Sequence, residues 1–475
     1  MKTFIFTKVH LNDVNNPQIV EVAMIAVHKR DLTDHGDGDN TSNNTRKMKR
    51  YIDKLVLCFD TQKPLNLHSA AKSNLDWQRI RGSNKKPFDR SSVLLMNEFL
   101  KRQNRPICFV AHHGFLMDFP ALKSEITALQ MSLFATEEEN LWIADTATAC
   151  QDLDAPDQHK MHETTLDAID YSMESLYLRY LKKRMPIETY TAEQYATCLM
   201  QLVDSISDQF INVVSIMKFS DVLPRDQKVA RALFPTQSTE NGGESVDQNE
   251  DPDRQADEYD IQTFVFLDLE TTGLDTTTDN ITELCLIAVD REQITELGNE
   301  VVEHEYGEFP KVPRVQDKLN ILIDPLSMIP NEVSRITKID KENLEVRNKK
   351  PFSYETSMIL RSFLDRQAHP ICLVAHNGNA FDYIILNNHL DRVKADQTIW
   401  KEIYCADSLT GVRELRQPCE RRPNGLQYLM KEVGVHHSQL LPHSAEGDTI
   451  ALMVVVKLFP QNLPMWLDQH KRRFK

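Results

Sequence analysis

The sequence repeats itself at one fixed spacing. Short identical segments recur 264 positions apart, so that Asn84 has its counterpart in Asn348. Chance identity would not keep one offset over about 65 positions, and the repeat of about 210 residues is too long for a solenoid unit. The sequence therefore predicts two tandem copies of one domain. The matching segments are Asp53–Leu55 with Asp317–Leu319, Asn84–Phe88 with Asn348–Phe352, and Pro106–Cys108 with Pro370–Cys372.

An acidic segment separates the two copies. Thr236–Asp260 holds nine acidic residues and one basic residue, Arg254, and so carries most of the formal net charge of −15. It has almost no large apolar side chains, and burial cannot offset the entropy lost on ordering it. We therefore predict domains at 1–235 and 262–475, joined by a flexible linker at 236–261. On the same grounds Asp31–Thr45 is predicted to be a surface loop.

Composition excludes several classes of protein. With 41% hydrophobic and 26% charged residues the chain is an ordinary globular protein. Its longest apolar run, Ile450–Val456, is far shorter than the roughly 20 residues of a membrane span. The first residues lack the apolar core of a signal peptide, and the eight cysteines form no C-x-x-C pair. We therefore expect reduced thiols, no membrane segment, no secretion, and a cytoplasmic or nuclear location.

Apolar periodicity predicts a mixed α/β domain in each half. In the second copy, short runs rich in Val, Ile, Leu and Phe are typical of buried strands, and longer segments with apolar residues at helical spacing are typical of helices. Strands followed by alternating helices favour a central mixed β-sheet flanked by helices. The predicted strands are Thr263–Leu269, Ile281–Val289, a segment including Asn320–Asp324, and Ile371–Ala375; the predicted helices are Phe352–Gln367, Phe381–Leu390 and Ala445–Phe459.

Acidic residues occur at three of these predicted element ends. Asp268 and Glu270 are two apart on a strand and share one face. Asp382 follows the strand Ile371–Ala375, and Asp448 lies in the first turn of the last predicted helix, five residues after His443. Each alone has an ordinary explanation, as a helix cap, a dipole partner or a solvated residue.

Together these residues indicate a metal site. Clustered carboxylates repel one another unless a cation neutralises them, and hard divalent ions prefer oxygen ligands. Two such ions can stabilise both the attacking and the leaving oxygen in a phosphoryl displacement. A nearby histidine can take a proton from the attacking water.

These segments resemble a known family. FLDLETTGL (Phe266–Leu274), LVAHNGNAFD (Leu373–Asp382) and HSAEGD (His443–Asp448) are similar to the three exonuclease motifs of the DEDDh superfamily, and most of all to the three-prime repair exonuclease (TREX) family. The resemblance covers about residues 262–474. It implies two tandem ribonuclease H-like exonuclease domains, and in the second a 3′→5′ DNA exonuclease that uses two Mg²⁺ ions, with Mn²⁺ as a possible substitute.

The resemblance also assigns roles to single residues. Asp268, Glu270, Asp382 and Asp448 would be metal ligands, and His443 the general base. Contacts with the substrate would come from a further set: Thr271, Thr272, Leu274, Ile336, Asn377, Phe381, Arg413 and His443. Ile336 would pack against the terminal bases, a contact that tolerates any sequence, although a core position explains it equally well.

The motifs depart from the family at a few positions. Ala380 stands where the family often has a basic residue, so one phosphate contact is expected to be absent. Arg416, Arg421 and Arg422 share a loop that either supplies phosphate affinity or is simply solvated. The proline-rich insert is reduced to Phe309–Pro313, and the sequence lacks the hydrophobic tail of the membrane-tethered member.

The first copy has lost most of the motif residues. Lys8 replaces Asp268, and His10 replaces Glu270, while Asp118 survives opposite Asp382. In the third motif the general base and the last acid are replaced by Tyr190 and Tyr195. Two-metal hydrolysis is implausible there, but the apolar pattern is retained. Because the family that the sequence resembles forms homodimers, we predict that this copy is an inactive intramolecular partner in a pseudo-dimer. The predicted contact is between the two DKL segments, Asp53–Leu55 and Asp317–Leu319.

Three alternatives stay open at this stage. The first is a 3′→5′ RNA exonuclease of the same superfamily, because discrimination at the 2′-OH is a fine detail. The second is a non-catalytic scaffold that binds nucleic acid or protein. The third is a proofreading subunit of a polymerase, which would need a polymerase-binding tail. The expected partner is DNA, single-stranded or with a free 3′ end.

Overall fold

The structure is a computed structural model. It describes residues 1–13, 17–33, 50–133, 141–158, 170–185, 191–224, 260–295, 301–304, 307–310, 312–416, 422–434, 443–460 and 462–474. The predicted linker at 236–261 lies outside the described residues except for its last two positions.

The elements follow the chain in two series. The strands are β1 (Thr3–Leu11), β2 (Ile19–His28), β3 (Asp53–Cys58), β4 (Ile107–Ala111), β5 (Leu141–Asp145), β6 (Ile216–Lys218), β7 (Thr263–Thr271), β8 (Ile281–Asp290), β9 (Val301–His304), β10 (Gly307–Pro310), β11 (Gln316–Leu322), β12 (Ile371–Ala375), β13 (Tyr404–Asp407) and β14 (Arg472–Arg473). The first-half helices are α1 (Lys29–Thr33), α2 (Leu67–Ser73), α3 (Trp77–Gly82), α4 (Arg90–Lys101), α5 (Asp118–Ala128), α6 (Thr146–Gln158), α7 (Met173–Leu181), α8 (Ala192–Ser205) and α9 (Ser207–Val213), with a 3-10 turn at Phe219–Asp221. The second-half helices are α11 (Arg291–Thr295), α12 (Asn331–Thr337), α13 (Lys341–Val346), α14 (Tyr354–Asp365), α15 (Asp382–Arg392), α16 (Thr398–Glu402), α17 (Ser408–Leu415), α18 (Leu426–Glu432), α19 (Ala445–Leu458) and α20 (Leu463–Gln469).

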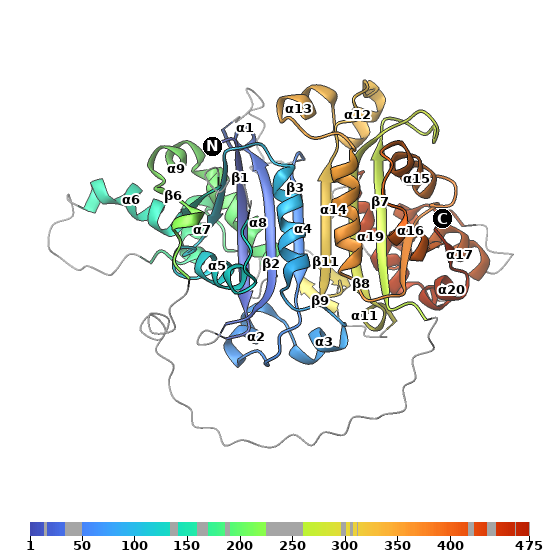
Figure 1. The fold of residues 1–475 in the computed structure, drawn as a ribbon, viewed down its shortest axis with the longest axis horizontal. Coiled ribbons are helices and arrows are strands. Elements are labelled where there is room, and N and C mark those ends of the chain that lie inside the picture. Colours follow the sequence, from blue (N-terminus) through green and yellow to red (C-terminus); the bar gives the residue numbers. More distant parts are fainter. Residues whose placement is uncertain are drawn as a thin grey trace, which may run out of the picture.

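One mixed sheet of twelve strands runs through both halves (Figure 1). Its order is β14-β13-β12-β7-β8-β11-β3-β2-β1-β4-β5-β6, while β9 and β10 form a separate pair. The halves meet where β11 pairs antiparallel with β3, with Leu319 opposite Leu55. The two DKL segments therefore lie in the strands that join the halves.

The strands of the two halves pair in the same way. β1 is antiparallel to β2 and parallel to β4, and β7 is antiparallel to β8 and parallel to β12. The register slips at the same place in both, between His10 and Leu11 and between Glu270 and Thr271. Asn84 and Asn348 also share a positive φ, of 47° and 46°.

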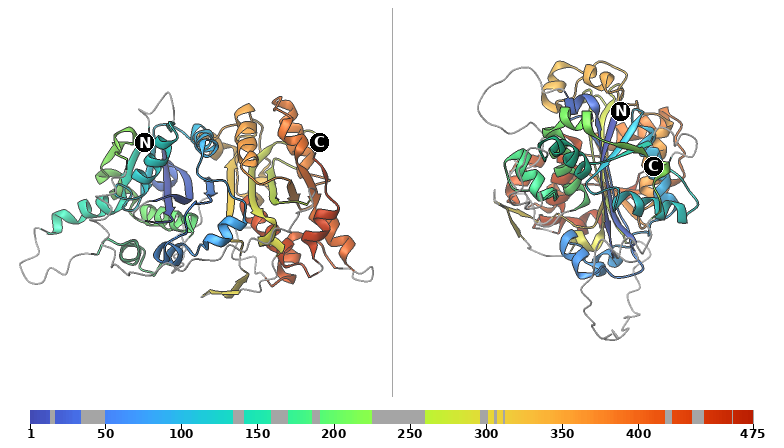
Figure 2. Two further views of the ribbon diagram at one scale, coloured as in Figure 1. Left: turned by 60° about the horizontal axis from the view of Figure 1, so that its bottom comes forward. Right: turned by 90° about the vertical axis from the view of Figure 1, so that its left-hand side faces the viewer.

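Helices cover both faces of the sheet (Figure 2). Helices α4 and α14 lie side by side over one face and share a core that spans both halves and includes Phe99 and Phe363 (Figure 1). On the other face α8 packs on β1 and β2, and α19 packs on β7 and β8. Phe264 and Phe266 point toward α19, whereas Val265 and Leu267 point toward α14, because successive strand residues face opposite sides.

Most predicted elements of the second half are confirmed. The strand Ile371–Ala375 is found with the same bounds, and the predicted helices begin and end within two residues of α14, α15 and α19. The third strand is β11, which ends at Leu322 rather than at Asp324. The expected loop at Asp31–Thr45 is wrong at its start. Asp31–Thr33 belongs to α1, because Leu32 is fully buried there, and residues 34–45 lie outside the described residues.

Two further expectations concern cysteines and membrane spans. Seven cysteines are buried free thiols, and Cys419 lies outside the described residues. In the described part of the chain, no helix is by itself long and apolar enough to cross a membrane; α19 and α20 together meet that length and composition, with a bend of 97° between them.

Candidate active site

Three of the predicted carboxylates meet on the α19 side of the sheet. Asp268 and Glu270 come from the end of β7, and Asp448 comes from the first turn of α19. One ligand oxygen from each lies within 4.8 Å of the others. Asp382, the first residue of α15, is buried, and its charge acts on Asp268. The fold thus brings three of the four predicted acids together, and Asp382 lies close enough for its charge to act on Asp268.

Burial and mutual repulsion shift the pKa values of these acids upward. Burial, then the charges of Asp382 and Asp448, hold the pKa of Asp268 well above its usual range. Burial, then the charges of Glu283 and Asp448, raise the pKa of Glu270 to about 8. Burial raises the pKa of Asp382 to about 7. A divalent cation would relieve both effects, so the donor set fits a hard metal ion.

A buried ion pair beside the carboxylates was not predicted from the sequence. Arg50, from the first half, donates to both oxygens of Glu283 at 2.7 and 2.6 Å. Glu283 also accepts the backbone N–H of Ala445, the first residue of α19, at 2.9 Å. An arginine of one half thus holds the helix that carries Asp448 in the other. The positive charge of Arg50 also offsets part of the rise in the pKa of Glu270. The sequence did contain one signal for this ion pair: Arg50 and Arg314 are identical residues 264 positions apart, the same spacing as the other repeated segments.

His443 lies outside this cluster in the structure. It is exposed, has a φ of 54°, and directly precedes Ser444, the N-cap of α19. Its Nε2 atom lies 3.3 Å from Nε2 of the exposed Gln427. The structure places His443 at the start of the helix that bears Asp448, but its ring is not among the atoms gathered within 4.8 Å. Its role as the base stays a prediction.

The predicted substrate contacts divide into exposed and buried side chains. Leu274 and Ile336 are 86% and 49% exposed, so both side chains are accessible to a ligand. Thr271 and Thr272 are buried instead, and their hydroxyls donate to Gly273 O and to Asp279. These two threonines therefore shape the loop that follows β7.

The other predicted contacts lie near the ends of β12, β13 and α17. Asn377 is exposed, has a φ of 69°, and donates its backbone N–H to Asp407. Phe381 is partly buried and packs against the core under α14. Arg413 is exposed in the last turn of α17.

The loop arginines are not a shared phosphate site. Arg416 is buried and donates to Pro423 O, Asn424 and Glu432, so the suggestion that it supplies phosphate affinity is wrong. Arg422 is half exposed and pairs with the same Glu432 at 3.3 Å. Arg421 lies outside the described residues.

At the matching place in the first half, a lysine stands beside the surviving acid. Lys8 Nζ lies 3.2 Å from Asp118, whose other contact is the N–H of Val9 at 2.7 Å. His10 pairs with Glu21 at 3.0 Å, and the ammonium of Lys8 lies over the ring of Tyr195. A built-in cation thus neutralises the carboxylate that a metal would otherwise share. Tyr190 lies outside the described residues.

Comparison with known proteins places the chain in a family. The Exonuclease family model matches residues 265–456, a range that contains the four carboxylates and His443. The chain is 33% identical to bovine three-prime repair exonuclease 1 over 219 residues, which is 45% of this chain and 69% of that protein. It is 35% identical to human three prime repair exonuclease 2 over 217 residues, covering 44% of this chain and 89% of that protein. The chain belongs to the three-prime repair exonuclease family.

Membership of the three-prime repair exonuclease family confirms the resemblance found in the sequence and makes the chain a nuclease by descent. Among solved structures, Escherichia coli exonuclease I in complex with a dT13 oligonucleotide aligns with a TM-score of 0.33 and 20% identity, over 44% of this chain and 43% of that one.

Proposed function

We propose that this protein is a Mg²⁺-dependent 3′→5′ exonuclease acting on DNA, and that its second half alone carries the active site. The observation that carries the proposal is the group formed by Asp268, Glu270 and Asp448, with Asp382 beside it, in a family of three-prime repair exonucleases. Mn²⁺ is a chemically acceptable substitute, because it also prefers carboxylate and water ligands.

Each carboxylate has a defined part in this proposal. Asp268, Glu270, Asp382 and Asp448 would hold two divalent ions. When bound, such ions stabilise the charge that develops on the phosphate as the bond to the leaving oxygen breaks. A ring nitrogen of a histidine can accept a proton from water. His443 therefore acts as the base that takes a proton from the attacking water, after turning from Gln427 toward the carboxylates.

Exposed apolar side chains position the substrate. Leu274 follows β7 closely, and Ile336 lies on α12. We assign both to the terminal bases, since stacking on apolar side chains requires no particular base. Arg413 contributes a positive charge for the phosphate backbone.

The first half is a duplicated domain that has become an inactive partner. Four charged side chains meet at the junction: Lys54 and Lys318, from the paired strands β3 and β11, each contact Glu193 and Glu446 at 2.8–3.0 Å. The contacts Lys54–Glu446 and Lys318–Glu193 join one half to the other. The ion pair between Arg314 and Glu21 repeats the one between Arg50 and Glu283. These reciprocal contacts are what a homodimer would make, and they support an intramolecular pseudo-dimer.

The test is digestion of end-labelled nucleic acid. We expect that with Mg²⁺ a single-stranded DNA labelled at its 3′ end loses the label at once as a mononucleotide, whereas a 5′ label shortens one step at a time. An RNA of the same sequence is the matched substrate, and EDTA the control. Faster digestion of RNA, or immediate release of a 5′ label, would contradict the proposal.

A further inference from the structure

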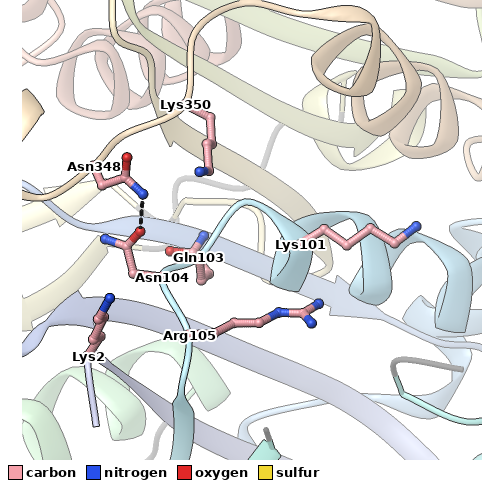
Figure 3. A pocket seen from close by; sticks show the side chains of 7 residues that line it. All are labelled: Lys2, Lys101, Gln103, Asn104, Arg105, Asn348 and Lys350. Carbon is pink, nitrogen blue, oxygen red and sulfur yellow. Dashed lines mark hydrogen bonds between the residues drawn. The ribbon is translucent and has the colours of Figure 1, made fainter. Parts of the chain in front are cut away.

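A basic pocket lies at the junction of the two halves. It has a volume of about 370 Å³ and is lined by four cationic residues: Lys2 before β1, Lys101 at the end of α4, Arg105 before β4, and Lys350 after α13 (Figure 3). The first three belong to the first half and the fourth to the second. Among the residues that the structure describes, no carboxylate lines it, although the chain as a whole has a formal charge of −15.

The cationic groups of the pocket are accessible. Lys2 and Lys101 are exposed, and Lys350 and Arg105 are partly buried. Within the described part of the chain, neither Lys2 nor Lys350 has an ion-pair partner; Lys101 pairs with Glu98 at 2.7 Å. Cationic groups held at one place attract an anion with several charges more strongly than any one of them would.

Amide side chains complete the pocket and connect the halves. Asn348 donates to Asn104 at 2.7 Å, and Asn104 donates to the carbonyl of Arg347 at 2.5 Å. Gln103 is buried and donates to Asp53 at 3.0 Å. Figure 3 shows Lys2 and Lys350 on either side of the Asn104–Asn348 pair. These bonds thus hold together the two chain segments, one from each half, that carry Arg105 and Lys350.

The repeat supplies a counterpart of this pocket at the other edge of the sheet. Lys2 and Gln262 donate their backbone N–H to Pro106 and Pro370 at 2.9 Å, so these positions correspond. At the repeat spacing Lys101 becomes Asp365, Arg105 becomes His369, and Lys350 becomes Lys86. Burial lowers the pKa of His369, which disfavours its charged form. The counterpart has one lysine and one aspartate in place of four cationic residues.

The basic pocket lies at the edge of the sheet that carries the catalytic carboxylates. β1 and β3 run in one direction, and β7 and β11 run in the opposite one, because β3 pairs antiparallel with β11. The end of β7, with Asp268 and Glu270, is therefore at the same edge as the start of β1. Five strand spacings separate β7 from β1, or roughly 24 Å. The degenerate site, at the end of β1, is at the edge with the counterpart pocket.

We propose that this junction pocket binds the phosphodiester backbone of a single-stranded DNA, upstream of the 3′ end that occupies the carboxylate site. The inference rests on the proposed function, because it assumes that a strand leaves the site along this edge. A free polyphosphate would use the same chemistry, so the experiment includes both ligands. A strand must be several nucleotides long to reach from the carboxylates to the pocket, at roughly 3.4 Å per stacked nucleotide.

The test compares long and short oligonucleotides. In full-length protein carrying Asp448→Asn to prevent cleavage, the triple change Lys2→Ala, Arg105→Ala and Lys350→Ala should weaken binding of dT20 about tenfold and leave dT3 unchanged. The salt dependence of dT20 binding should also become shallower, by about 0.7 in log–log slope for each phosphate that the variant no longer neutralises. The matched control is Lys86→Ala in the counterpart, which should leave dT20 binding unchanged.

Other outcomes would overturn the inference. Equal weakening of dT3 would mean that the change acts on the carboxylate site. Unchanged dT20 binding, with inorganic tripolyphosphate bound by the parent and not by the triple variant, would show a site for small anions instead. Equal melting temperatures exclude misfolding. Because binding is measured without cleavage, the inference can fail while end-labelled digestion still supports the exonuclease, and the reverse result is also distinguishable.

Discussion

At the residue scale, the two equivalent sites differ in the side chain that stands beside the one acid they share. In the first half the ammonium of Lys8 lies beside Asp118, while in the second half Asp268 stands at the same strand position and adds a negative charge beside Asp382. One arrangement is neutral without a ligand, and the other is repulsive until a cation binds. The second site therefore lowers the stability of the protein when it is free of metal.

This repulsion predicts the effect of removing one charge. Because the pKa of Asp268 is raised by burial and neighbouring carboxylates, its ionisation at neutral pH opposes folding. Asp268→Asn should therefore raise the melting temperature of the metal-free protein and abolish the further rise that Mg²⁺ gives the parent. At 100 times its dissociation constant a ligand stabilises a fold by about 2.7 kcal/mol. Differential scanning calorimetry with and without Mg²⁺ measures both shifts, and a lower metal-free melting temperature for Asp268→Asn would contradict this account.

The sequence predicted the acids at this scale, but not their neighbours. Asp268 and Glu270 follow from strand alternation, and Asp448 from a helix start, all of them local signals. Glu283 was not identified, because its significance depends on Arg50, which is 233 residues away. The side-chain position of His443 also escapes sequence reasoning, since a motif specifies which residue is present and not which way its ring turns.

At the scale of elements, the start of α19 is the feature that connects the halves to the chemistry. Its first N–H binds Glu283, and Glu283 is held by Arg50. In the first half the N–H of Ala192, at the start of α8, binds Glu21, which is held by Arg314. A buried arginine–glutamate pair therefore supports the start of a helix at each site, and only one of these helices, α19, carries an acid of the carboxylate cluster.

This pairing offers a matched experiment. Arg50→Ala and Arg314→Ala each break a buried pair, and each should lower the free energy of unfolding by about 3 kcal/mol. Only Arg50→Ala should lower kcat, by about tenfold, and raise the Mg²⁺ concentration needed for half-maximal rate, because only α19 carries Asp448. Unfolding in urea and initial rates across a Mg²⁺ series measure the two effects. Equal losses of kcat in the two variants would contradict this role of Arg50, because they would mean that lower stability alone reduces kcat.

The elements themselves were largely predictable from sequence. Buried strands such as Ile371–Ala375 and helices such as α14 have periodic apolar patterns, and their predicted bounds hold to within about two residues. The short helix α1 was missed, because the run DLTDHGDGDN has the composition of a loop and only Leu32 holds the turn against the core.

At the scale of the whole molecule, buried charges join the halves into one sheet. Asp53 accepts the N–H of Leu322 and pairs with Lys349, and Asp317 accepts the N–H of Cys58 and lies near Lys85. The repeat predicted which segments correspond. The two DKL segments, which lie in β3 and β11, were predicted as the contact between the halves. That these strands pair to make a single sheet of twelve strands was not predicted, since strand pairing between domains has no local signal in either strand.

These charges predict how stability depends on pH. Although burial opposes it, Lys349 lowers the pKa of Asp53, Lys85 lowers that of Asp317, and Lys318 lowers that of Glu446. A carboxyl with a depressed pKa stabilises the fold above its unfolded value, and that contribution is lost as the pH falls through the folded value. The free energy of unfolding should therefore fall steadily below about pH 4.5.

Urea unfolding between pH 6 and pH 3 measures this dependence. Lys318→Met should make it shallower, because Glu446 then has less to lose on protonation. Stability that stays constant down to pH 3, or an unchanged slope in Lys318→Met, would contradict the role given to the junction charges.

The most direct test of the account uses the one acid that both halves retain. Asp382→Asn should lower the rate of Mg²⁺-dependent release of nucleotides from 3′-labelled DNA by about 10³ or more, the scale expected for loss of a transition-state interaction at the metal site. Asp118→Asn, at the same position of the first half, should leave the rate per folded molecule within about threefold of the parent. Comparable losses in the two variants, or a larger loss for Asp118→Asn, would contradict the claim that the chemistry belongs to the second half alone.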